Sequence, residues 1–221
     1  MTLPQLSQPA IEPVDTQAPT QPGPGLAFRE TMVGWFATGV HDPVIGARLG
    51  EVRGTALRVR ASVQIPDLPT FERDDAHAGM ITGTVDFGAI GKGMPASRGA
   101  LHLFSPDDGG GKQMVYALTF HHDGQSYCLS GRKHLTGFSL ARAWWENTAV
   151  YATLHRGTDA RCPVLAAGIL RVDVLALFGM LTTLRGTGGS RMERLSAPFR
   201  FGKFYAGELW DSYVNHKQRA D

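Results

Sequence analysis

The chain has few cysteines and little net charge. Of its 221 residues only Cys128 and Cys162 are cysteine, and their separation has no metal-binding pattern. The N-terminal segment has neither the basic start nor the apolar run of a secretory signal. We therefore expect a cytoplasmic protein whose two thiols are free and buried rather than paired. The formal net charge is +2 and the basic residues are scattered, so no nucleic-acid footprint is expected.

Long apolar runs and catalytic motifs are also missing. The longest apolar stretch, residues 163–184, is interrupted by Arg171 and Asp173, which argues against a membrane-spanning helix. The chain has no Gly-x-Ser-x-Gly elbow and no glycine fingerprint for a nucleotide. Its eight histidines are dispersed, and the adjacent pair 121–122 would point to opposite faces of a strand. We expect no metal and no cofactor.

Short runs of alternating apolar and polar residues dominate what remains. In residues 114–122 the apolar side chains occupy every second position, including Tyr116. The following Asp123-Gly124 predicts a two-residue hairpin turn into a partner strand at 125–133. A turn is expected at 41–43. Further strands are expected at 27–38, 54–65, 80–90, 100–104, 147–155 and 165–172, with short helices at 138–146 and 174–184.

The two ends of this region have a similar character. Residues 28–36 and 199–210 are both rich in aromatic residues and glycine, and both alternate in polarity. We interpret the second as a strand pair, 194–205 and 206–214, kinked at its glycines. Matching first and last strands predict a sheet that closes on itself. The expected fold is an all-β, antiparallel, closed or nearly closed barrel over 26–214, between a disordered proline-rich tail at 1–25 and a short tail at 215–221.

Several polar residues are candidates for a site within such a barrel. Arg29 and Glu30 could meet the polar end of a ligand at the barrel mouth, or form a surface ion pair of little energetic value. His102 interrupts an apolar run, and would be either a satisfied core residue or a catalytic base. Lys133 and Glu208 could likewise meet a ligand or form surface ion pairs, and we favour a surface position for each.

Aromatic residues could line an apolar pocket or simply fill the core. We include Trp35 and Tyr116 among the ligand-binding candidates. The candidate set is completed by Arg29, Glu30, His102 and Glu208, with Glu30 and His102 as the only candidates for a catalytic group.

Ordered motifs extend over about residues 26–214. They are Phe28-x-Glu30-Thr31-Met32-x-Gly34, Ile81-Thr82-Gly83-Thr84-Val85, Gly99-x-Leu101-x-Leu103-Phe104, Met114-x-Tyr116-x-Leu118-x-Phe120, Tyr127-x-Leu129-x-Gly131-x-Lys133, Ala167-Gly168-Ile169-Leu170 and Phe201-Gly202-Lys203-Phe204-x-x-Gly207-Glu208-Leu209-Trp210. In this order they resemble a bacterial domain fused to, or found beside, cholesterol-oxidase-like GMC flavoenzymes and lipase-like α/β-hydrolases. The segment 146–150 departs from the family pattern of an acidic residue with two threonines.

The resemblance implies a lipocalin-like (calycin-type) barrel that accompanies lipid or sterol chemistry. It brings no flavin site, because the chain has no flavin-binding glycine motif. The leading hypothesis is therefore a non-catalytic barrel that binds a hydrophobic small molecule and supports a GMC-type flavoenzyme or an α/β-hydrolase. The alternatives are an isomerase or cyclase that works inside the barrel, and a protein-interaction module without a ligand.

Overall fold

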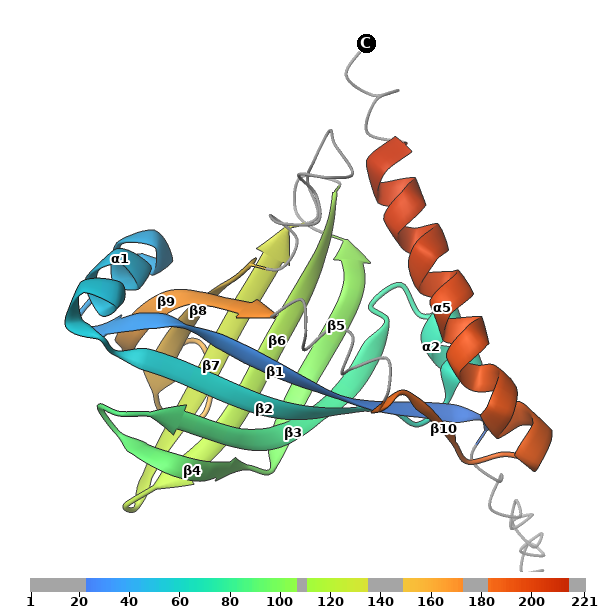
Figure 1. Ribbon diagram of the computed structural model, residues 1–221, viewed down its shortest axis with the longest axis horizontal. Coiled ribbons are helices and arrows are strands. Elements are labelled where there is room, and N and C mark those ends of the chain that lie inside the picture. Colours follow the sequence, from blue (N-terminus) through green and yellow to red (C-terminus); the bar gives the residue numbers. More distant parts are fainter. Residues whose placement is uncertain (1–22, 107–110, 135–148, 173–182, 215–221) are drawn as a thin grey trace, which may run out of the picture.

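Eight antiparallel strands close into a barrel in the computed structural model (Figure 1). The structure describes residues 23–106, 111–134, 149–172 and 183–214, with only the backbone at 134 and 209–214. The expected antiparallel barrel is confirmed. Its strands are β1 (Gly25–Thr38), β2 (Ala56–Ile65), β3 (Ala78–Phe87), β5 (Arg98–Pro106), β6 (Lys112–His122), β7 (Gln125–His134), β8 (Ala149–Arg156) and β9 (Val164–Val172).

The barrel closes where β1 meets β9. Their antiparallel register runs from Met32 opposite Val172 to Thr38 opposite Ala166. The other edge of β1 pairs with β2 along ten residue positions, Leu26 to Trp35. Two short strands lie outside the circuit, β4 (Gly91–Ala96) on β3 and β10 (Arg185–Thr187) at the start of β1.

The strand pattern places one set of side chains inside. On β2 the buried residues are Leu57, Val59, Ala61, Val63 and Ile65, and the intervening residues are more exposed. This strict alternation follows from the pleat of a strand that has the core on one face and solvent on the other. The hairpin between β6 and β7 turns at Asp123 and Gly124, whose φ angles are 48° and 73°. Two positive φ angles define the expected two-residue turn.

The C-terminal segment differs from the expected strand pair. It forms one helix, α5 (Arg191–Val214), so the predicted closure of the sheet by this segment is wrong. Ala197, Phe201, Phe204 and Tyr205 lie against the core, at the three- and four-residue spacing of one helix face. The glycines expected to kink a strand are on α5, and a Cβ added at Gly202 would meet no other atom within 4 Å.

Two further helices were not expected, and the first of them begins within the turn expected at 41–43. α1 (Pro43–Arg53) begins at Asp42, whose carboxylate accepts hydrogen bonds from the backbone N–H groups of residues 44 and 45. α2 (Leu68–Arg73) begins in the same way at Asp67. An aspartate N-cap followed by proline in the first turn is a helix start signal. The expected helix at 138–146, and most of that at 174–184, lie outside the described residues.

The helices lie at different parts of the barrel. In Figure 1, α1 is at the left, beside the ends of β1 and β9, whereas α2 and α5 are at the right. Among the described residues, no helix has both the length and the apolar character needed to cross a bilayer.

Candidate functional site

A buried carboxyl group lies inside the barrel at the end covered by α5. Glu30 is only 8% exposed, and it lies on β1 between the inward-facing Phe28 and Met32. Its Oε1 atom is buried and has no hydrogen-bond partner in the described part of the chain. Burial raises the pKa of Glu30 from 4.5 to about 7, because the apolar surroundings disfavour the charged form.

The other buried polar residues that the structure describes, His77 and His155, have hydrogen-bond partners that Glu30 Oε1 lacks. The His155 ring nitrogens lie 2.8 Å from Thr153 Oγ1 and 2.8 Å from the Cys162 carbonyl oxygen. His77 Nδ1 lies 2.7 Å from the carbonyl oxygen of Phe71. Both histidines are thus satisfied structural residues, whereas Glu30 has an unused acceptor.

Lys133 is the cation whose charge acts on Glu30. It follows Tyr127, Leu129 and Gly131 at alternate positions of β7, and so shares their inward face. Burial lowers the pKa of Lys133 from 10.5 to about 8, while the charge of Glu30 acts in the opposite direction. The expectation that Lys133 lies on the surface is wrong. The alternation of β7 predicts an inward-facing Lys133, because the alternation continues from Tyr127 through Lys133.

A tyrosine hydroxyl completes this group. Tyr116 is buried on the inward face of β6, directly opposite Gly131 of β7. Burial first, and then the charges of Glu30 and Tyr205, raise the pKa of Tyr116 well above its usual range. Tyr116 therefore keeps its proton and remains a hydrogen-bond donor at neutral pH. We call Glu30, Tyr116 and Lys133 the lumen cluster.

Aromatic side chains of α5 cover the lumen cluster. The Tyr205 ring packs 5.0 Å from Phe104, and the Phe201 ring packs 6.2 Å from Phe28, centroid to centroid. The Phe204 ring lies 5.6 Å from Phe71 of α2. Edge-to-face and tilted pairs at these distances are favourable in addition to the area that they bury.

Two ion pairs join α5 to α2 and to the barrel. Arg200 on α5 donates to both carboxylate oxygens of Glu72 on α2, with its Nε 2.9 Å from each. Lys112 at the start of β6 forms an ion pair with Glu208. The predicted ligand residue Glu208 therefore lies on the covering helix and holds it to the barrel.

The other predicted site residues lie elsewhere. Arg29 and Trp35 are exposed on the outer face of β1, Trp35 by 39%. His102 lies on the face of β5 opposite to the buried Leu101 and Leu103, with Nδ1 3.3 Å from the Ala76 carbonyl oxygen. The structure thus brings Glu30 and Tyr116 together and separates them from Arg29, Trp35 and His102.

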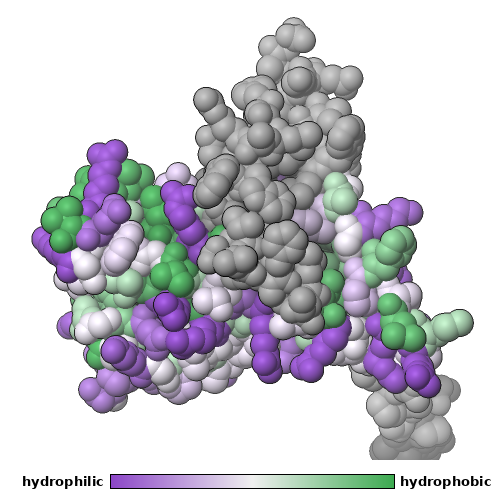
Figure 2. All heavy atoms as spheres, viewed as in Figure 1, coloured by the Kyte–Doolittle hydropathy of each residue, from purple (hydrophilic) through white to green (hydrophobic). Residues whose placement is uncertain are grey.

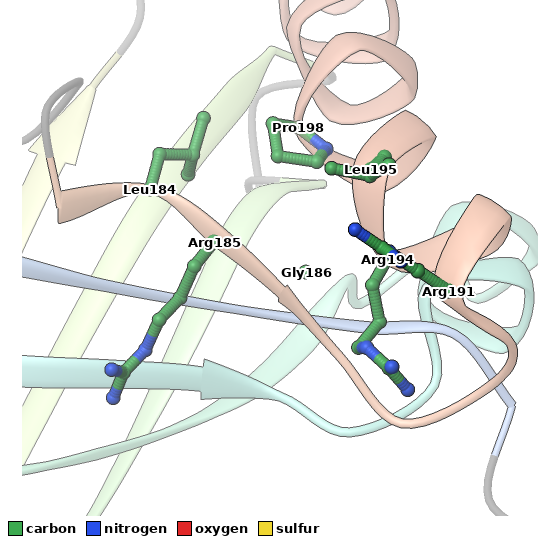
Figure 3. Close-up of a pocket in the computed structure, with 7 residues that line it drawn as sticks. All are labelled: Leu184, Arg185, Gly186, Arg191, Arg194, Leu195 and Pro198. Carbon is green, nitrogen blue, oxygen red and sulfur yellow. The ribbon is translucent and has the colours of Figure 1, made fainter.

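Hollows of the described surface lie beside this cluster rather than in it. One, of about 440 Å³, is bordered by β10 and the start of α5 (Figure 3), and another, of about 230 Å³, is bordered by β1, β2 and residues 183–185. Neither is lined by a residue of the lumen cluster. Both cysteines are free thiols, and no group of three or more possible metal ligands occurs among the described residues.

Fold and site together define a closed eight-stranded antiparallel barrel with a buried glutamate and tyrosine and a half-buried lysine under one end. Comparison of the chain with protein-family models, with curated proteins and with solved structures finds no significant match.

Proposed function

We propose that the barrel binds a hydrophobic small molecule, of the lipid or sterol-like class, whose polar end meets the lumen cluster. The observation that carries this proposal is the buried Oε1 atom of Glu30, which lacks a hydrogen-bond partner among the described residues. A buried acceptor without a partner costs about 1–3 kcal/mol, and a ligand that donates a hydrogen bond removes this cost.

The chemistry of the cluster selects the polar end of the ligand. Glu30 and Lys133 carry opposite charges when both are ionised, so their charges already offset one another. A charged ligand group would upset this balance, whereas a neutral hydroxyl or carbonyl group would not. A hydroxyl group can donate to Glu30 and accept from Tyr116. The rest of the ligand would lie against apolar strand residues such as Val63 and Leu101.

Access to the cluster requires movement of α5. Its aromatic residues and its two marginal ion pairs lie over this end of the barrel. The proposed physiological setting is that implied by the motif resemblance, an accessory role beside a GMC-type flavoenzyme or a hydrolase that acts on lipids.

Ligand retention tests the proposal. Purified protein is incubated with a lipid extract, separated from free lipid, and its bound molecules are identified by mass spectrometry. Wild type is expected to retain a neutral hydroxylated lipid and to gain thermal stability with it. Glu30→Gln should weaken binding about 10-fold, because the charged acceptor is replaced by a neutral amide oxygen, which forms a weaker hydrogen bond. Glu51→Gln, at an exposed position of α1, is the matched control. Absence of any retained lipid and of any thermal shift would contradict the proposal.

A second candidate function is proton transfer on the bound molecule, as in an isomerase or cyclase. The specific observation is that the pKa values of Glu30 and Lys133, about 7 and about 8, lie close to neutral pH. A general acid or base is most effective when its pKa is near the working pH. Recovering the ligand after incubation in D₂O distinguishes the two functions. Deuterium incorporation that falls at least about 100-fold in Glu30→Gln indicates catalysis, and unchanged ligand indicates binding alone.

A further inference from the structure

Helix α5 has a second apolar face that points away from the barrel. Met192, Leu195 and Phe199 are 80%, 73% and 80% exposed. Their three- and four-residue spacing places them in one stripe along the helix. Ala197 and Phe201, which pack on the core, lie on the opposite side. A row of three large apolar side chains in solvent is uncommon on a soluble surface and marks a contact site.

Basic residues flank this stripe. The exposed Arg191 lies on one side of the stripe, and the exposed Lys203 lies toward the other. Figure 2 shows hydrophobic and hydrophilic residues side by side at the right of the view, where the first half of α5 lies. Apolar and hydrophilic side chains therefore lie next to one another on this surface.

The hollow next to the stripe extends the cationic surface. Its lining combines Arg185, Arg191 and Arg194 with Leu184, Leu195 and Pro198, and none of its lining residues is acidic (Figure 3). Arg194 Nη1 is anchored 2.8 Å from the Gly189 carbonyl oxygen, which holds the guanidinium at the border of the hollow. The adjacent hollow shares Arg185 and adds Arg29.

The nearby acidic residues are engaged elsewhere. Glu193 accepts a hydrogen bond from the Ser190 backbone N–H at 2.7 Å, at the start of the helix. Glu72 is paired with Arg200. The charge that the α5 stripe and its flanks present to a partner is therefore positive.

We propose that this surface, the α5 outer face, docks the protein on an anionic phospholipid membrane. Met192, Leu195 and Phe199 would enter the boundary between headgroups and acyl chains, while Arg185 and Arg191 contact phosphates. Amphipathic helices with basic flanks bind interfaces in this way. Charge complementarity favours the membrane over a second copy of the chain, because two copies would bring the same arginines together. Membrane docking through the α5 outer face does not depend on ligand binding inside the barrel.

Vesicle sedimentation tests this docking. The full chain is mixed with phosphatidylcholine vesicles with and without phosphatidylserine, neither containing sterol. Wild type is expected to sediment only with the anionic vesicles, and less so at high salt. The triple variant Met192→Ser, Leu195→Ser, Phe199→Ser should lose at least about 10-fold in partitioning. The double variant Arg185→Gln, Arg191→Gln should lose the preference for phosphatidylserine.

The controls separate docking from folding and from ligand binding. Val52→Ser removes an equally exposed apolar residue, 86% exposed on α1, and should sediment as wild type does. Glu30→Gln should also sediment normally, since it alters only the lumen cluster. Circular dichroism checks that each variant is folded. Wild type that stays in solution with anionic vesicles, or a triple variant that sediments equally, overturns the proposal. A dimer in light scattering that the triple variant abolishes would assign the face to a second copy and overturn it as well.

Discussion

Helices α1 and α5 contact the barrel in different ways. At one end α1 lies on the strands backbone to backbone: a Cβ added at Gly46 would stand 2.1 Å from the Ala167 carbonyl oxygen, and one added at Gly50 would stand 2.4 Å from Phe36 N. At the other end α5 is held through long side chains, by ring contacts such as Phe201 with Phe28 and by ion pairs at its margins.

This difference indicates which end opens. The contact of α1 leaves no room for movement, because helix and strand backbones touch directly. The contact of α5 can be released without breaking a strand pair of the barrel. The buried charged groups also lie beneath α5, and their desolvation opposes tight closure there. Ligand exchange is therefore expected at the α5 end, and α1 is expected to be a fixed part of the barrel.

The largest expected effect concerns the aromatic contacts under α5. Phe201→Ala removes a buried ring that packs against Phe28 and Phe71, and should lower the free energy of unfolding by about 4 kcal/mol. Phe199→Ala, two residues away and 80% exposed, should change it by less than about 0.5 kcal/mol. Urea denaturation measures both. Equal effects would mean that α5 does not bury the face described.

The lumen cluster predicts a pH dependence of stability. The folded pKa of Glu30 is raised from 4.5 to about 7, so the folded protein holds this proton more tightly than the unfolded chain. The stabilisation is complete below pH 4.5 and is lost as the pH rises through 7, with an amplitude on the order of 3 kcal/mol. Lys133, whose folded pKa is lowered from 10.5 to about 8, adds stability as the pH rises from 8 to 10.5.

Stability should therefore have a minimum between pH 7 and 8 that comes from this pair. Urea denaturation of wild type and of Glu30→Gln across this range isolates the contribution of Glu30. The variant should lack the fall between pH 4.5 and 7. A wild-type curve parallel to that of the variant would show that Glu30 titrates as an ordinary surface carboxylate.

A third prediction tests the rigid end. Gly46→Ala should destabilise the protein by about 2 kcal/mol, because the added methyl group would overlap a backbone carbonyl of β9. Gly202→Ala, which places a methyl group in open space on α5, should instead stabilise by about 0.5–1 kcal/mol through helix propensity. If both substitutions change the free energy of unfolding in the same direction in urea denaturation, α1 and α5 do not differ in how tightly they contact the barrel.

The smallest effect on stability is expected from the marginal ion pairs. Arg200→Gln removes the partner of Glu72 and should cost less than about 1 kcal/mol, since both side chains are partly exposed. Hydrogen exchange should nevertheless become faster in α5 and remain unchanged in α1. Faster exchange in both helices would show that the ion pair stabilises the whole barrel rather than its cover.

The strand pattern of the barrel could be predicted from the sequence, and the nature of its C-terminal cover could not. The β6–β7 hairpin has a strict alternation and a turn that only a few residue pairs form. In α5, aromatic residues at 199, 201 and 204 are compatible with both a strand and a helix. Tertiary packing, rather than the local sequence, decides between strand and helix here. β1 already pairs with β2 and β9 and leaves no full edge for another long strand.

Part of the candidate site could be predicted from strand alternation, and the rest depends on contacts distant in sequence. Alternation on β1 and β6 places Glu30 and Tyr116 inside, and both were expected to contact a ligand. Arg29 was grouped with Glu30 as its neighbour in sequence, although adjacent residues of a strand face opposite sides. The meeting of Glu30 with Lys133 depends on the barrel closing, which no local pattern of the sequence contains.

Titration of the Glu30 carboxyl group by ¹³C NMR shows whether this group is buried beneath α5. We expect a midpoint near pH 7, as for a carboxyl group buried in the lumen. Replacement of Lys133 by Met should move this midpoint higher, since the attraction that favours the charged form is removed. A Glu30 midpoint near its ordinary value of 4.5, unchanged in Lys133→Met, would contradict a buried acid–base pair beneath α5.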